Sequence, residues 1–164
     1  MAQVRHQLPY MNFYRFCQLL EQSQPEMPVP GSDWRVRQEP VRFRPHPGMG
    51  FPAGEIRGME DPEHPHLPPS VRVTFMGLYG VESPLPTHYT DDIAQRREGH
   101  DATQDFLDIF SHRLITQYYR IWRKYSYPAT FQAGGADNTS QYLLGLAGLG
   151  IPGCAQTAGT PLSR

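Results

Sequence analysis

The stretch that decides the fold is DFLDIFSHRLITQYYRIWRKY, residues 105–125. Large apolar residues return at intervals of three or four, the spacing of one face of an α-helix. The stripe consists of Phe106, Phe110, Leu114, Tyr118, Ile121 and Tyr125, and it is widened by Leu107, Ile109, Ile115, Tyr119 and Trp122. An apolar stripe this wide has to be covered on more than one side.

The residues around this stretch indicate where the helices begin and end. Asp101 followed by Gln104 has the pattern of a capping box, and Pro128 cannot continue a helix, so we predict a helix over about 103–125. Near the N-terminus, Asn12 is a good N-cap for a short amphipathic helix that ends before Pro25. The apolar face of that helix carries Phe13, Phe16, Cys17 and Leu20.

Two further short helices are expected. Thr87 can cap a helix that runs to about residue 97, and Gly99 follows in the usual stop position. Thr139 or Ser140 can cap a last helix through Leu146.

Two segments alternate apolar and polar residues, which predicts half-buried strands. Val41 and Phe43 alternate with arginines over 41–44. Val71, Val73 and Phe75 alternate with Arg, Thr and Met in a strand predicted over 71–78. The expected fold is therefore α+β, a small antiparallel or mixed sheet packed against one long amphipathic helix and several short helices.

The 164 residues include 17 Pro and 15 Gly, which predicts a loop-rich chain. Prolines are dense from Pro45 to Pro69, so that segment cannot be a regular helix, and we expect Phe51 and Ile56 to anchor it to the core. The length fits one domain over 1–150. The Gly, Pro, Ala, Thr and Ser of residues 151–164 predict a disordered or truncated tail.

Charge and composition exclude several classes of protein. The net charge is −1, so no global field would attract nucleic acid or anionic lipid. The first residues contain no apolar core that could serve as a signal peptide, and the longest apolar stretch, residues 142–151, is too short to span a membrane, which favours the cytoplasm. The two cysteines, Cys17 and Cys154, form no disulfide framework or zinc motif.

Histidines raise the question of metal binding and catalysis. His64 and His66 are held on a proline-stiffened segment that matches no usual zinc spacing, so we expect exposed loop histidines. Asp108 and His112 are four residues apart on the long helix, which predicts an ordinary surface pair.

An enzyme remains an alternative hypothesis. A small hydrolase or metal-binding enzyme would use His88, Asp91 and His112, and it requires these side chains to converge in a pocket. RNA binding is a third possibility because arginines alternate with aromatic residues, although the neutral charge argues against it. The excess of apolar surface on one long helix points instead to a protein partner.

Five segments in this order resemble the TssG (ImpH/VasB) family of type VI secretion baseplate proteins. They are FYRFCQLLE (13–21), PVRFRPHPGMGFPAGEI (40–56), VRVTFMGLYG (71–80), SPLPTHY (83–89) and the stretch 105–125. The resemblance extends from about residue 10 to 150. TssG-like chains are usually about twice as long, so it implies the N-terminal half only.

The resemblance implies a structural subunit without catalysis, cofactor or metal. TssG-like proteins join TssF and TssK in a wedge of the baseplate, in the cytoplasm at the cytoplasmic face of the inner membrane. The long helix and the turn 83–89 would then pack within the domain and against TssF. The residues that we assign to partner binding are Phe13, Phe16, Leu20, Leu85, Tyr89, Phe110, Tyr118, Trp122 and Tyr125. Sequence alone does not divide them between core and interface.

Overall fold

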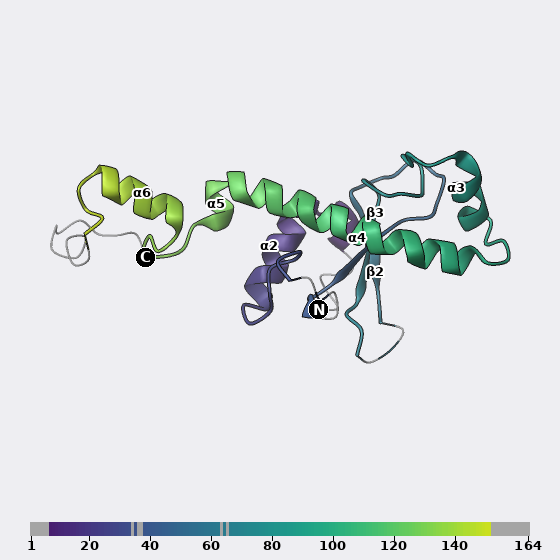
Figure 1. The fold of residues 1–164 in the computed structure, drawn as a ribbon, viewed down its shortest axis with the longest axis horizontal. Coiled ribbons are helices and arrows are strands. Elements are labelled where there is room, and N and C mark those ends of the chain that lie inside the picture. The colour runs from purple at the N-terminus through teal and green to yellow at the C-terminus, as the bar shows by residue number, and fades with distance from the viewer. Residues whose placement is uncertain (1–6, 34, 36–37, 63, 65, 152–164) are drawn as a thin grey trace. The chain divides into compact units, whose positions relative to one another are not determined.

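The computed structural model describes residues 7–33, 35, 38–62, 64 and 66–151, and Figure 1 traces them from the purple N-terminal end to the yellow C-terminal end. The chain divides into two compact units, Met1–Arg120 and Ile121–Arg164. Helix α4, His100–Tyr125, begins in the first unit and ends in the second. Cys154 and residues 152–164 of the predicted tail lie outside the described residues, and the domain boundary near residue 150 stays a prediction.

A three-stranded sheet lies in the first unit. Its strands are β1 (Arg42–Pro45), β2 (Ile56–Glu60) and β3 (Ser70–Val73). The central strand β3 pairs parallel with β1 and antiparallel with β2, so the sheet is mixed. Together with the long helix and the short helices, this confirms the predicted α+β class.

The strands that we predicted from the sequence differ in part from those of the observed sheet. The strand predicted over 71–78 ends at Val73, since the chain soon turns through Met76, whose φ is +52°. Strand β2 lies inside the proline-rich segment 45–69, which we expected to be a loop. Residues 56–60 contain no proline, and the many prolines around them led us to overlook this short strand. Ile56 is a buried anchor as expected, whereas the prediction for Phe51 is wrong, because its side chain is 96% exposed.

The first unit also contains η1 (Leu8–Tyr10), α2 (Phe13–Ser23) and α3 (Thr87–Ala94). Asn12 caps α2 as predicted, and its side chain accepts a hydrogen bond from the Tyr14 amide. Thr87 does not cap α3, because Pro86 occupies that position. The helix ends before Arg96, which takes up the left-handed conformation (φ +52°) that we expected first at Gly99.

The capping box predicted for α4 is also absent. The helix starts at His100, which places Asp101 inside its first turn, where a carboxylate favours the helix dipole. Gln104 does not reach back to a cap. Its amide donates a hydrogen bond to the Tyr79 hydroxyl at 3.2 Å instead.

Aromatic side chains from α2, β1 and α4 meet in the core of the first unit. The Phe13 ring lies edge-on to the rings of Phe43, Phe75 and Tyr119, with centroid distances of 5.3, 5.0 and 6.2 Å. Edge-to-face pairs of this kind add to the gain from burial, which is about 1.5–3 kcal/mol for each such side chain. Cys17 is buried beside this cluster on α2, and burial raises the pKa of its thiol.

The second unit contains α5 (Tyr127–Thr130) and α6 (Asn138–Leu146). The cap of α6 is Asp137, not Thr139 or Ser140 as predicted. Its carboxylate accepts hydrogen bonds from the Ser140 amide at 3.0 Å and from the Ser140 hydroxyl at 2.7 Å. In the described part of the chain, no helix has both the length and the apolar character that crossing a membrane requires.

Candidate protein-protein interface

Helix α4 has an unusual division of faces. Its buried face is largely polar and consists of Leu107, Asp108, Ser111, His112, Ile115, Thr116 and Tyr119. The stripe of large apolar residues that predicted the helix lies elsewhere and is exposed. In the first unit this exposed surface, which we call the α4 apolar face, consists of Phe106, Ile109, Phe110, Leu114 and Tyr118.

Asp108 is the centre of the polar contacts on the buried face. The Arg44 guanidinium on β1 donates to one carboxylate oxygen, and the Tyr79 hydroxyl donates to the other at 2.6 Å. A second Arg44 nitrogen lies 2.7 Å from Asp105, one turn earlier on α4. Burial raises the pKa of Asp108, and the donors from Tyr79 and Arg44 offset part of that rise.

His112 makes a second buried polar contact. Its Nδ1 accepts a hydrogen bond from the Phe43 amide at 3.0 Å, so Nε2 is the protonated nitrogen of the neutral ring. Nε2 lies 3.1 Å from a carboxylate oxygen of Glu39, which is itself buried. The prediction of an ordinary surface pair for Asp108 and His112 is therefore wrong, since each residue binds groups from other elements inside the fold.

These contacts determine which way α4 faces. Buried polar groups are costly when they lack partners, and Asp108 and His112, turned inward, bind the Arg44 guanidinium, the Tyr79 hydroxyl and the Phe43 amide. The helix cannot rotate its phenylalanines into the core without breaking these hydrogen bonds. The α4 apolar face is therefore exposed as a consequence of the polar core.

Both edges of this exposed face are built by other segments. On one edge, Arg113 and Arg120 donate hydrogen bonds at 3.0 Å to the backbone carbonyls of Asp33 and Gly31. On the other edge, the Tyr118 ring lies 5.8 Å from the ring of Tyr14. Within the face, the Phe106 and Phe110 rings are 5.2 Å apart and edge-on.

The residues predicted to bind a partner fall into three groups. Phe13, Phe16 and Leu20 are buried in the core of the first unit. Leu85 is half-buried against the cluster of Tyr79, Ile93 and Leu107, and Trp122 is also half-buried. The exposed group consists of Tyr89, Phe110, Tyr118 and Tyr125.

Three members of the α4 apolar face were left out of the predicted partner-binding residues. Phe106 and Ile109 are the most exposed of the five, at 59% and 63%, and Leu114 is exposed beside them. All three belong to the periodic stripe that predicted the helix. To predict that these residues are exposed, one needs to know which side of the helix faces the core. The position of Asp108 and His112 on one face of the helix was a signal that this face is buried.

No hydrogen bond or ion pair joins the three residues of the enzyme hypothesis to one another. His112 is buried and bound to β1, whereas His88 is exposed and its ring lies 4.1 Å from the Tyr89 ring at a tilt of 35°. Asp91 binds Arg97 and Gln95 near the end of α3. Among the described residues, no group of three or more His, Cys, Asp or Glu side chains could hold a metal ion.

These features describe an α+β domain that exposes the apolar face of a long helix, the arrangement of a protein-binding module. The comparison with known families agrees. The chain belongs to the TssG family of type VI secretion, whose model matches residues 7–163.

One matching solved chain is 86% identical in sequence, with a TM-score of 0.29. Its structure is described as the type VI secretion system TssK-TssF-TssG baseplate subcomplex, determined by cryo-electron microscopy. The match covers 35% of the present chain and 24% of that chain. No curated protein matches.

Proposed function

We propose that the chain is a structural subunit of a type VI secretion baseplate and that its α4 apolar face binds a TssF-like subunit. The observation that carries the proposal is the exposure of five large apolar side chains on one helix of a TssG family member. Contiguous apolar surface of this kind marks interaction sites on soluble domains. Aromatic anchors spaced along a helix suit insertion into a groove of a partner.

The size of the face bounds what it can do alone. Five side chains that are each about half exposed present roughly 450 Å² of apolar surface. At about 25 cal/mol per Å², burying that surface yields roughly 11 kcal/mol, which is similar to the roughly 4–15 kcal/mol that association costs. The α4 apolar face is therefore the centre of an interface, and a stable complex needs about as much surface again around it.

Of the other predicted residues, we retain Leu85, Tyr89, Trp122 and Tyr125 as further contacts and assign Phe13, Phe16 and Leu20 to the core. The proposed subunit acts by binding alone, without catalysis, cofactor or metal. TssK-like subunits are its second partners, in keeping with the composition of the matched solved subcomplex. Its place is the cytoplasm, at the cytoplasmic face of the inner membrane once the baseplate is assembled.

The test is a binding titration against a TssF-like protein of the same secretion system. Phe110→Glu places a charge in the middle of the α4 apolar face and should weaken the complex by about 30-fold or more, the effect of losing a hot spot. Tyr10→Ser, which also replaces an exposed aromatic side chain but on η1, serves as the matched control and should bind normally. Equal affinity of Phe110→Glu and the unmodified chain, with both folded, would refute the proposed interface.

A further inference from the structure

The proline- and glycine-rich segment 45–54 is held firmly at both of its ends. At its start, the His46 amide donates to the Val73 carbonyl at 2.8 Å. At its end, the Thr74 hydroxyl donates to the Gly54 carbonyl at 2.7 Å. A Cβ at Gly54 would lie 2.3 Å from the Pro9 carbonyl oxygen, so the segment is pressed against η1 at this glycine.

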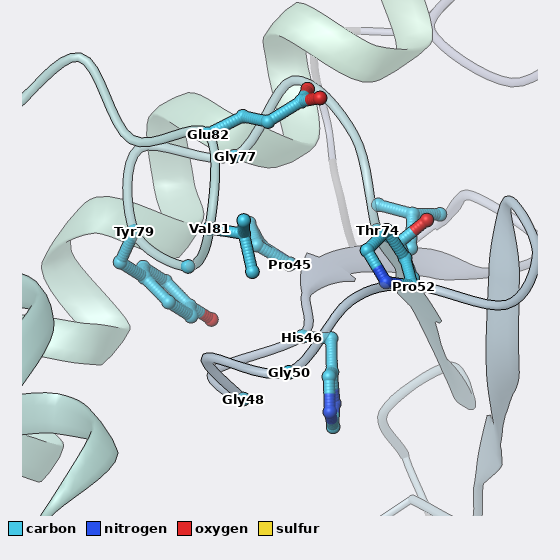
Figure 2. A pocket seen from close by; sticks show the side chains of 12 residues that line it. Pro45, His46, Gly48, Gly50, Pro52, Thr74, Gly77, Tyr79, Val81 and Glu82 are labelled. Carbon is cyan, nitrogen blue, oxygen red and sulfur yellow. The ribbon is translucent and has the colours of Figure 1, made fainter.

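A second segment closes against the same loop. Figure 2 shows the turn that carries Gly77, Tyr79 and Val81 facing Pro45 and His46. Added Cβ atoms at Gly77 and Gly80 would meet Pro45 and the His46 carbonyl oxygen at 2.6 and 2.8 Å. The cavity left between them has a volume of about 20 Å³, room for no more than one water molecule. The base of the loop is thus packed on two sides.

The tip of this well-held loop carries exposed apolar side chains. Phe51 is 96% exposed and Met49 is 54% exposed. Because the base of the loop is already ordered, a partner that binds Phe51 would lose little free energy in ordering the backbone. Pre-organised aromatic side chains of this kind are the usual anchors of binding sites.

Beside Phe51 lies a second cavity with a volume of about 120 Å³. Its apolar walls are Pro9, Phe51, Pro52 and Ile56. A cavity of about 150 Å³ holds a benzene molecule, so this one fits a single side chain of the size of Leu. It is separate from the α4 apolar face, since none of its lining residues lies on α4.

One charged side chain lines this cavity. It is Arg57, because no Asp or Glu is among the lining residues, and burial together with the charge of Arg57 lowers the pKa of His46, which leaves its ring neutral at pH 7. The nearby Glu60 is bound to Arg72 at 2.9 Å, and Glu55 is bound to the Phe13 amide at 2.7 Å. Both carboxylates therefore already accept hydrogen bonds from donors within the fold, and Arg57 is the cation that can pair with an anion at the mouth of the cavity.

We propose that this cavity, with Phe51 as one wall, binds an extended acidic segment of a partner protein. One apolar side chain of the segment enters between Phe51 and Pro52, and a neighbouring carboxylate pairs with Arg57. The carboxylate distinguishes acidic segments from neutral ones, and the apolar side chain supplies most of the contact area. This surface is additional to the proposed function and does not depend on it.

The probe is a synthetic peptide of sequence Gly-Glu-Leu-Asp-Glu-Gly with blocked ends, followed by amide NMR of the labelled full chain. We expect it to shift the signals of residues around Phe51, Ile56 and Arg57. Its neutral counterpart, in which Gln and Asn replace Glu and Asp, should bind at least about fivefold more weakly. Replacing the Leu of the acidic peptide by Gly should also remove most of the binding.

Variants of the chain complete the test. Phe51→Ala and Arg57→Glu should each weaken the acidic peptide at least about fivefold, and the high exposure of Phe51 means that its loss does not threaten folding. Phe110→Glu should bind the peptide normally, which separates this proposal from the one for α4. The proposal is overturned if the acidic peptide shifts no signals, if the neutral or Gly peptide binds equally well, or if Phe51→Ala retains full affinity.

Discussion

Replacing Asp108 by Asn tests whether the polar contacts under α4 hold the helix in its orientation. The substitution preserves the shape of the side chain but removes the charge that faces the buried Arg44. It also leaves one oxygen where two now accept hydrogen bonds, one from Arg44 and one from Tyr79 at 2.6 Å. Breaking one partner of a buried ion pair costs about 3–5 kcal/mol.

The structure places the expected cost near the lower end of that range. Arg44 keeps its contact with Asp105 at 2.7 Å, so the remaining charge is not left alone. We expect the free energy of unfolding to fall by about 3 kcal/mol, which lowers the melting temperature by roughly 6–12 °C in a chain of this length.

Urea unfolding followed by circular dichroism measures this change. The matched control is Asp105→Asn, which removes the other carboxylate bound to Arg44, but from a side chain that is 69% exposed. It should cost no more than about 1 kcal/mol. A loss of less than about 1 kcal/mol for Asp108→Asn, or a larger loss for the control, would refute the reasoning.

Three smaller perturbations test other parts of the structure. Glu55→Gln should lower the free energy of unfolding by about 1 kcal/mol in urea unfolding, since the carboxylate binds the Phe13 amide at the start of α2; no loss would argue against this contact. Burial and the charge of Arg57 lower the pKa of His46 below 6.5, so protonation should reduce stability as the pH falls through that value, and an NMR titration that gives 6.5 or more would contradict this. The hydrogen bonds from Ser140 lower the pKa of Asp137, so the cap of α6 should stabilise the second unit above about pH 4 and weaken as the pH falls through the lowered pKa. The Ser140 amide signal reports that weakening, and an unchanged signal down to pH 2 would count against the cap.

Periodicity predicted the long helix well but not the way it faces. Spacings of three and four placed Phe106, Phe110 and Leu114 on one stripe, and such a stripe usually marks the buried side. Here the buried side is the one with Asp108 and His112, because these residues bind polar groups inside the fold. Their partners Arg44 and Phe43 lie far away in the sequence. Contacts across more than 60 residues leave no local pattern in a sequence.

The proline-rich segment shows a second limit. Its composition correctly excluded a helix, and Ile56 was correctly expected in the core. Strand β2 and the exposure of Phe51 were missed, since both depend on pairing with β3 and on contact with η1. The composition of a segment indicates which conformations its backbone can adopt, but not which other segments it contacts.

The resemblance to the TssG family, unlike the individual residue assignments, rested on five segments taken in order, and the match over residues 7–163 confirms it. The residues that can contact a partner are those on the surface, and the residue type alone does not show which ones these are. Phe13 and Phe110 have the same chemistry in the sequence, yet one is buried and the other is exposed.

Photo-crosslinking from α4 tests the central claim most directly. A benzophenone-bearing phenylalanine analogue would replace Phe110 in one sample and Tyr10 in another, and each chain would be irradiated with the TssF-like protein. The account predicts a crosslinked pair of chains from position 110 and little or none from position 10. No crosslink from position 110, under conditions in which the two proteins co-purify, would show that the complex forms through another surface and would contradict it.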